Sequence, residues 1–217
     1  GRDGFRRWPG LVNMINSHTD LNKAGSGRAV YQQPDFDIII VGGGPAGATA
    51  ARLLAGSFSV ALIDLKDDSA NSFRKPCGGL LASDAQQALS RYQLTLPKDI
   101  LVDPQIFAVK TIDLQSGLIR HYQRFYINLD RHKFDMWLLS LIPQNVARIQ
   151  GRCTGISRLQ QGFSIRYSGK DSEAQLTCRW LLAADGANSL VRRELFPGFR
   201  PGSYVAIQDW YEEQDQD

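Results

Sequence analysis

A strand, a glycine-rich turn and a helix follow one another without interruption near the start of the chain, and this succession constrains the fold more than any other feature. Residues 35–55 read DFDIIIVGGGPAGATAARLLA. The β-branched run at 38–41 is typical of a strand buried on both faces. The next six residues fit the spacing G-x-G-x-x-G and lead into an Ala/Leu/Arg-rich helix. The succession predicts an α/β fold with a Rossmann-like parallel sheet.

Each glycine of this motif has a mechanical role in a turn that binds a dinucleotide. We expect Gly42 to allow the tight turn out of the strand, Gly44 to let the backbone approach a pyrophosphate, and Gly47 to let the helix pack on the sheet. Pro45 and Ala46 open the helix, whose N–H groups and dipole would face the phosphates. The turn therefore predicts a cofactor site at the helix start.

A second apolar strand, expected at 58–65, ends on an acidic residue. Asp64 lies about 20 positions after the glycines, where a carboxylate at the strand tip can accept hydrogen bonds from a ribose. The alternative is that Asp64 only begins a solvated turn with the charged residues 66–68. The strand–turn–helix–strand context favours a bound adenine dinucleotide. This context does not distinguish NAD from FAD as the bound dinucleotide.

Composition narrows the class of protein. A length of 217 residues suffices for one good core, or for one domain and part of a second. The net charge of +3 is too small and too scattered to argue for nucleic acid. The cysteines and histidines have neither disulfide nor metal-ligand spacing, which predicts no metal site and favours a reducing compartment: Cys77, Cys153, Cys178, His18, His121 and His132. Since no apolar run approaches the roughly 20 residues that span a bilayer, we expect a cytoplasmic protein with at most peripheral membrane contact.

The N-terminal residues differ from the rest. Residues 1–34 are polar, Gly-rich and mildly basic, and they lack the apolar core of a signal peptide. We expect them to form a disordered arm, or to be vector or leader sequence.

Helical patterns occur twice after the second strand. Residues 83–91 are expected to form a helix with Ser83 as its N-cap. A second helix is expected to open at Asp130 and to end before Pro143, with apolar residues at helical spacing: Phe134, Trp137, Leu138 and Leu141.

Strand patterns fill much of the remainder. Alternating runs at 108–114 and 118–122 predict a hairpin inside a small insertion at 105–129, and 125–129 is strand-like. Three runs at 147–159, 163–167 and 174–182, separated by turn residues, predict an antiparallel meander. A further strand is expected to start at 204–208.

Three segments, in this order, resemble one large group of FAD-dependent oxidoreductases, those with the para-hydroxybenzoate-hydroxylase fold. GGGPAG with Asp64 resembles its ADP-binding unit, and LDRHKFDMWLL at 129–139 resembles its R-x-x-F/L-D-x-x-L helix. AADGANSLVR at 183–192 resembles its A-D-G-x-x-S-x-V-R segment. In that group a three-stranded meander occupies the crossover before this last segment, and the strand pattern indicates such a meander independently. The resemblance implies FAD as the cofactor.

Two further segments point to one branch of this group. KPCGGL at 75–80 is similar to the CGG loop of the geranylgeranyl reductase family, and AIQDWY at 206–211 is similar to that family's entry into its substrate domain. Flavin-dependent halogenases and hydroxylases carry similar loops. Family members are longer, and continue with a second flavin-contacting segment and most of the substrate sheet. We therefore expect an FAD-binding domain at 35–200 and the start of a truncated, β-rich substrate domain at 201–217.

The resemblance also implies roles for charged residues. It places Arg131 over the flavin's phosphate or ribityl region, whereas the alternative is an exposed arginine paired with Asp135 one turn along the helix. It assigns Asp185 and Gly186 to the pyrophosphate, with Arg192 adding positive charge. An Asx-type cap is the alternative for Asp185, and one carboxylate can serve both purposes.

The KPCGG loop is implied to lie beside the isoalloxazine, with Lys75, Pro76 and Gly78 near the cofactor. Cys77 is the candidate catalytic residue, since its thiol could donate a proton, tune the flavin or only pack. Cys153 is near the point where the family's backbone contacts adenine, so any contact there would come from main-chain atoms.

The implied reaction is hydride transfer from reduced flavin to an isoprenoid C=C bond, with protonation of the neighbouring carbon. The implied substrate is a hydrophobic small molecule or prenyl lipid, and the electron donor is NAD(P)H or a small redox partner. One alternative is a flavin-dependent monooxygenase or halogenase, in which reduced flavin meets O₂. Another is a non-catalytic fragment that binds FAD. A plain NAD-dependent dehydrogenase leaves the meander, the Asp-Gly segment and the KPCGG loop unexplained.

Overall fold

The computed structural model describes residues 33–66, 76–170, 172–205 and 207–209. The chain divides into two units, residues 1–33 and 34–217, and the fold below is that of the second. All but the last two residues of the expected N-terminal arm lie outside the described part. The elements that form the sheet and its two faces are β1 (Phe36–Val41), α2 (Pro45–Leu54), β2 (Val60–Asp64), α4 (Arg131–Ser140), β7 (Ala147–Gln150), β8 (Arg152–Arg158), β9 (Phe163–Ser168), β10 (Glu173–Ala183) and α5 (Leu190–Leu195).

The main sheet has six strands in the order β7-β2-β1-β10-β9-β8. The first four run parallel to one another, and β10, β9 and β8 form an antiparallel meander. β10 belongs to both parts, because its residues 173–178 pair with β9 while 178 and 180–183 pair with β1. The predicted α/β fold with a parallel sheet and a three-stranded meander crossover is confirmed.

The prediction of one meander strand at 147–159 is wrong. The run holds two strands, of which β7 extends the parallel sheet beside β2 and β8 begins the meander. Gly151 separates them, and its N–H donates to the Asp64 carbonyl at 2.9 Å. A Cβ atom at this glycine would stand 2.9 Å from the Ser168 carbonyl oxygen. The alternation of side chains continues across the break, so the pattern alone did not reveal it.

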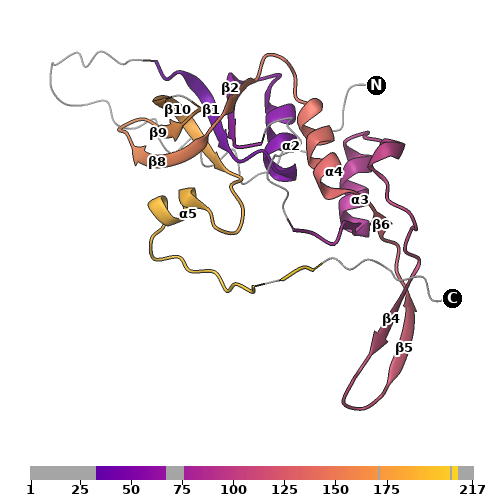
Figure 1. The fold of residues 1–217 in the computed structure, drawn as a ribbon. Helices are drawn as coiled ribbons and strands as arrows, with labels where there is room; N and C mark the ends of the chain where they lie inside the picture. The colour runs from indigo at the N-terminus through magenta and orange to yellow at the C-terminus, as the bar shows by residue number, and fades with distance from the viewer. Residues whose placement is uncertain (1–32, 67–75, 171, 206, 210–217) are drawn as a thin grey trace, which may run out of the picture. The chain divides into compact units, whose positions relative to one another are not determined.

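Both faces of the parallel strands are covered. Ile38 and Ile40 of β1 face the helical side, where they pack with residues of α2 and α4 such as Ala51 and Leu138. Alternate residues of the same strands face the meander and α5: Ile39, Val41, Ala61 and Ile63 pack with Ile156, Ile165 and Val191. Figure 1 shows α2 and α4 on one side of the sheet and α5 on the other. The expectation of a strand buried on both faces is confirmed.

The segment between β2 and α4 carries smaller elements: β3 (Leu80–Leu81), α3 (Ser83–Arg91), a 3₁₀ turn (Lys98–Ile100), β4 (Ala108–Ile112), β5 (Ile119–Gln123) and β6 (Ile127–Asn128). β4 and β5 form the predicted hairpin, and β3 pairs with β6. The helix at 83–91 is confirmed, but Ser83 is its first residue and Ala82 is the N-cap. The second predicted helix is confirmed as α4, and its N-cap Asp130 accepts from the Lys133 N–H at 3.0 Å.

The strand expected to start at 204–208 is not seen in the described residues there, 204, 205, 207 and 208. The side chains of Tyr204 and Val205 are fully exposed, and no strand of the described chain pairs with them. Within the described part, no helix has the length and apolar character needed to cross a membrane.

Replacing Gly47 with alanine is expected to destabilise the fold by about 3 kcal/mol, because the new methyl group overpacks a rigid backbone contact. A Cβ atom there would stand 1.8 Å from the Gly42 carbonyl oxygen. The free energy of unfolding in urea measures the effect. Gly56→Ala is the control, since nothing lies within 4 Å of its added methyl. A loss in Gly47→Ala no larger than in the control would contradict the packing role.

Candidate nucleotide-binding site

The glycine turn joins the end of β1 to the start of α2 through close backbone contacts. Gly42 has a φ of 101°, and its Cβ would stand 2.4 Å from the Ala184 carbonyl oxygen of the neighbouring strand. Gly47 packs directly on the Gly42 carbonyl. Gly44 has open space where a Cβ would stand. The turn and packing roles of Gly42 and Gly47 are those predicted, and the open side of Gly44 leaves its backbone accessible to a ligand.

The start of α2 has the properties of an anion site. Pro45 occupies the first helical position, and Gly44 at the N-cap supplies no capping side chain. The N–H groups of Ala46 and Gly47 lie in the first turn, where a helix has no partner for them within itself. The first turn also carries no acidic residue, so its positive end is not offset there.

Two carboxylates flank the turn, and each has a buried oxygen atom without a hydrogen-bond partner in the described part of the chain. They are Oδ2 of Asp64 and Oδ1 of Asp185. Asp64 lies against Gly43, whose Cβ would stand 2.4 Å from that same Oδ2. The Cα of Asp185 would stand 2.9 Å from a Cβ on Gly42. The structure therefore brings together two acidic residues that are 121 positions apart, at one turn.

Asp185 also forms a hydrogen bond to the backbone of the turn that follows it. Its Oδ2 accepts the Val191 N–H at 3.2 Å, while Oδ1 stays unpartnered in the described chain. The following Gly186 has a φ of 81°, which favours glycine at this bend. The capping alternative for Asp185 is thus present and leaves one oxygen available. The Arg192 guanidinium donates to the Ala187 carbonyl at 2.7 Å, within its own loop.

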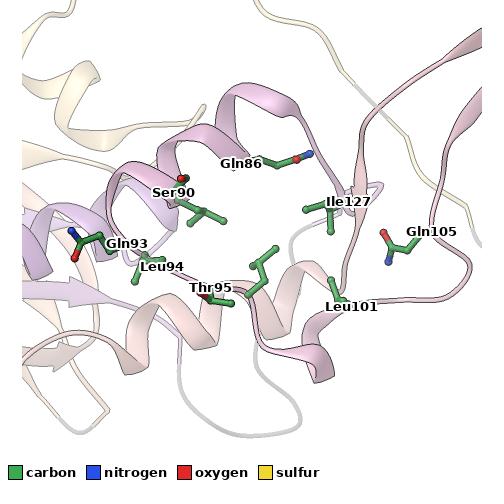
Figure 2. Close-up of a pocket in the computed structure, with 10 residues that line it drawn as sticks. Gln86, Ser90, Gln93, Leu94, Thr95, Leu101, Gln105 and Ile127 are labelled. Carbon is green, nitrogen blue, oxygen red and sulfur yellow. The ribbon is translucent and has the colours of Figure 1, made fainter.

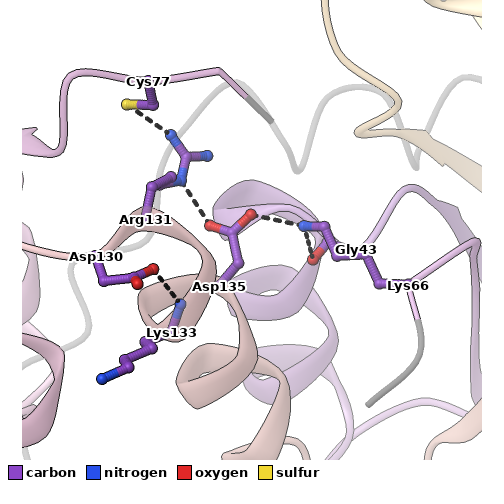
Figure 3. A network of polar contacts seen from close by, with 7 residues as sticks. All are labelled: Gly43, Lys66, Cys77, Asp130, Arg131, Lys133 and Asp135. Atoms are coloured by element: carbon purple, nitrogen blue, oxygen red, sulfur yellow. Dashed lines mark hydrogen bonds and ion pairs between the residues drawn. The ribbon is translucent and has the colours of Figure 1, made fainter. Parts of the chain in front are cut away.

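A buried carboxylate connects the glycine turn to α4 (Figure 3). Asp135 is 3% exposed, and its Oδ2 lies 2.6 Å from Nζ of Lys66. Lys66 also donates to the Gly43 carbonyl at 3.4 Å. On the other side, Oδ1 of Asp135 lies 2.7 Å from Nε of Arg131. The two cations exceed the one carboxylate, so this cluster adds positive charge beside the turn.

The pairing of Arg131 with Asp135 is the alternative considered for this arginine, but its setting is not an exposed helix face. The Arg131 side chain is 26% exposed, and its Nη1 lies 3.7 Å from the Cys77 Sγ. Burial alone lowers the pKa of Arg131. The hydrogen bond and charge of Asp135, with the contact to Cys77, outweigh burial and leave that pKa raised. The guanidinium therefore stays charged at the junction of α4 and the Cys77 loop.

The loop before β3 is held by its glycine. Gly79 has a φ of 71°, and its Cβ would meet the Leu129 carbonyl oxygen at 2.3 Å. Its carbonyl accepts the Leu129 N–H at 2.9 Å. Gly78 has open space around it, whereas Cys77 is half-buried.

The structure says less about two other predicted cofactor-binding residues of this loop. Pro76 is exposed, and Lys75 lies outside the described residues. The Cys77 carbonyl also accepts from Nε2 of Gln208 at 3.2 Å, so the chain after α5 returns to this loop.

Cys153 lies at an irregularity in the pairing of β8 with β9. Burial raises the pKa of its thiol, and the nearby charges of Asp185 and Glu194 add to that effect. The expectation that the main chain near Cys153 contacts a ligand stays a prediction.

A cavity of about 270 Å³ opens beside Asp64 and Lys66. Its walls are Leu62, Asp64, Lys66, Leu139, Arg148, Ile149 and Gln150. Arg148 and Gln150 come from β7, in register with Leu62 and Asp64 of β2. Sequence reasoning missed these two residues because it placed them in the meander rather than in the parallel sheet.

No protein-family model matches the chain. Curated relatives include Protein CbrA of Escherichia coli strain K12 and of Shigella sonnei strain Ss046, each 47% identical over 181 residues. The match covers 82% of this chain and 51% of each relative, so the chain spans about half the length of the curated relatives it matches.

Several solved structures are similar in fold. A geranylgeranyl bacteriochlorophyll reductase-like protein from Thermoplasma acidophilum has a TM-score of 0.59 and 19% identity, with 70% of this chain and 39% of that chain covered. The p-nitrophenol 4-monooxygenase PnpA from Pseudomonas putida DLL-E4 has a TM-score of 0.59 and 20% identity, with coverage of 74% and 43%. Aklavinone-11 hydroxylase, solved with FAD and aklavinone, has a TM-score of 0.60 and 20% identity, with coverage of 76% and 35%. This likeness shows the fold.

Replacing Asp135 with asparagine is expected to lower the free energy of unfolding by about 2 kcal/mol, because two cations lose their buried partner while remaining partly solvated. Asp99→Asn, at an exposed carboxylate, should change it by less than about 0.5 kcal/mol. Urea denaturation measures both. In the double variant with Lys66→Met, the losses should not add, since the two side chains share one contact. If the two losses in free energy of unfolding add, the ion pair does not couple Asp135 to Lys66.

Proposed function

We propose that this chain binds FAD through the glycine turn and forms the cofactor-binding part of an FAD-dependent oxidoreductase. The observation that carries the proposal is the pair of buried, unpartnered carboxylate oxygens on Asp64 and Asp185 at the turn. Buried polar atoms without a partner cost free energy, and they are rare unless a ligand or water satisfies them. A ribose and a hydrated diphosphate would supply the missing donors.

The residues present fit the adenosine diphosphate half of the cofactor. Asp64 would accept from the ribose hydroxyls, as acidic residues at this strand tip do in dinucleotide folds. The N–H groups of Ala46 and Gly47 would donate to the diphosphate across the open side of Gly44. Lys66 and Arg131 would offset part of the diphosphate charge.

The choice of FAD over NAD rests on the rest of the fold. The meander crossover and the Asp185-Gly186 turn lie beside the dinucleotide turn, and the similar solved structures include a hydroxylase with FAD bound. The loop of Cys77 and Gly78 would face the flavin ring, and Arg131 would lie between this loop and the phosphates. Bound FAD would supply the hydride-transfer chemistry, and the chain would orient it and exclude water.

For the reaction itself, we propose reduction of an isoprenoid C=C bond, as in the geranylgeranyl reductase family. The KPCGG loop supports this choice, together with the likeness in fold to a geranylgeranyl bacteriochlorophyll reductase-like protein. The substrate would be a prenyl lipid or a similar hydrophobic molecule, and NAD(P)H or a small redox protein would supply electrons. The three free thiols suit a reducing, cytoplasmic location.

Titration with FAD tests the cofactor site. We expect the purified chain to bind FAD and turn yellow, and Asp64→Asn to weaken binding about tenfold or more, because a charge-assisted hydrogen bond to the ribose is lost. The same substitution should leave the ligand-free protein equally or more stable, since it removes a charge with a buried, unpartnered oxygen. Calorimetry and urea denaturation measure the two effects.

Asp99→Asn is the control for this titration, because it makes the same chemical change at an exposed carboxylate. Equal FAD affinity in the wild-type chain and Asp64→Asn would contradict the proposed hydrogen bonds between Asp64 and the ribose. A chain that stays colourless after FAD is added would contradict the proposed function.

Reoxidation of the loaded protein tests the reaction class. After reduction with dithionite under anaerobic conditions, the yellow colour is expected to return when a prenyl substrate is added, because the C=C bond accepts the hydride. A saturated prenyl analogue is the control and should leave the protein colourless. No recovery with the prenyl substrate, together with O₂-dependent oxygenation or halogenation of an added aromatic compound, would favour a monooxygenase or halogenase, classes whose members share this fold.

A further inference from the structure

The hairpin formed by β4 and β5 lies beside no other strand of the described chain. The two strands make a sheet of their own, and Figure 1 shows them extended next to each other. All of β5 is exposed, and so is β4 apart from Val109, which is half-buried. A hairpin on its own is only marginally stable in water, so a further strand or a covered face would stabilise this one.

The base of the hairpin is anchored by a side-chain amide. Oε1 of Gln105 accepts the Asn128 N–H at 2.9 Å, and its Nε2 donates to the Asn128 carbonyl at 2.9 Å. Figure 2 shows Gln105 with Ile127 at one end of a cavity of about 610 Å³ that α3 borders. Gln105 therefore ties together the two segments that lead into β4 and out of β5.

Both outer edges of the hairpin carry backbone groups that the hairpin itself does not pair. The Asp113 N–H donates to the Leu118 carbonyl at 2.9 Å, and the Arg124 N–H donates to the Phe107 carbonyl at 3.0 Å. Pairs bonded in this way alternate along two antiparallel strands with pairs whose backbone groups point outward. The outward residues are therefore 108, 110 and 112 in β4 and 119, 121 and 123 in β5.

Of these two edges, that of β4 is the less protected against pairing with another strand. Proteins block edge strands with proline, bulges or charged side chains. Neither strand contains proline, and their register runs without a shift. β5 carries Arg120 and His121 next to each other, whereas Lys110 is the one charged residue of β4.

Large apolar side chains are exposed at both ends of the hairpin. Leu114 in the turn is 92% exposed, and Phe107 at the base is 72% exposed. Apolar surface that gathers on one element marks a site of interaction, because covering it removes apolar area from water. The exposed apolar residues of the hairpin and its base include Phe107, Ile112, Leu114, Leu118, Ile119 and Phe125.

The longer relatives indicate what covers the hairpin. Protein CbrA of Escherichia coli strain K12 matches this chain over 181 residues, which are 51% of the relative. A match of that length within 217 residues spans the hairpin in the middle of the chain. The relative therefore combines the hairpin region with a further polypeptide segment of about equal length.

We infer that β4 is a docking edge for a β-strand from a segment equivalent to the part of Protein CbrA outside the match. The strand would pair with the outward backbone groups of β4, as in other cases of strand addition, and its sheet would cover the exposed apolar side chains. A strand suits this edge better than a lipid surface, because hydrocarbon would leave the outward N–H and C=O groups without partners. The inference goes beyond the proposed function and does not depend on the cofactor.

Co-expression of this chain with that part of Protein CbrA, followed by co-purification, tests the inference. Lys110→Pro removes an outward N–H from β4 and no hydrogen bond within the hairpin, so it is expected to reduce the complex about tenfold or more. His121→Pro makes the same change at the outer edge of β5 and should leave the complex intact. Lys110→Thr, which removes the charge and keeps the N–H, is the second control. Circular dichroism checks that each variant folds.

Amide hydrogen exchange in whole Protein CbrA gives a second measurement, which needs no association of separate polypeptides. The amides aligned with residues 108, 110 and 112 are expected to exchange about tenfold or more slowly than the same amides of this chain alone, because a strand pairs with them.

Each outcome decides the inference. Loss of the complex in Lys110→Pro alone supports β4 as the docking edge. Loss in His121→Pro alone, equal loss in both, or a complex that neither variant weakens overturns it. If the separate polypeptides do not associate, slow exchange at the aligned amides of whole Protein CbrA supports the inference, and fast exchange overturns it. Dimers of this chain alone that Lys110→Pro abolishes would show that a second copy pairs with the edge, and would also overturn it.

Discussion

The contact of Gly47 with the Gly42 carbonyl is the constraint on which the rest of the structure depends. A methyl group at Gly47 would stand 1.8 Å from that oxygen, and one at Gly42 would stand 2.4 Å from the Ala184 carbonyl oxygen. These approaches lock the start of α2, the end of β1 and the end of β10 together. Because β10 is also one of the three strands of the meander, one turn aligns both parts of the sheet. The first N–H groups of α2 are thereby directed to the edge where the parallel strands end.

The charged groups around the turn are arranged at a free-energy cost that a ligand would offset. Asp64 and Asp185 each keep a buried oxygen without a partner in the described chain. Asp135, by contrast, is saturated by Lys66 and Arg131. The difference is the physical reason to regard the turn as a binding site and the Asp135 cluster as its support.

Much of this arrangement could be predicted from the sequence, because it depends on local spacing. The strand, the glycines, α4 with its Asp130 cap and the hairpin all follow from patterns within a few residues. What could not be predicted depends on long-range neighbours. Gly43 occupies a variable position of the motif, and only the fold shows Asp64 packed against it. The helix pattern indicates Asp135 only as a partner of Arg131 and does not show that Lys66 reaches it from another loop. The break at Gly151 could not be predicted for the same reason, because it depends on a long-range neighbour. A Cβ atom at this position would stand close to the Ser168 carbonyl oxygen across the sheet.

The central claim is that the turn at the start of α2 holds a diphosphate. The most direct measurement is a titration of the ¹⁵N-labelled chain with ADP, followed through the backbone amide signals. We expect the signals of Gly44, Ala46 and Gly47 to shift together and to saturate, because their N–H groups would exchange water for phosphate oxygens. Unmoved signals at these residues, with shifts elsewhere or none at all, would contradict the account.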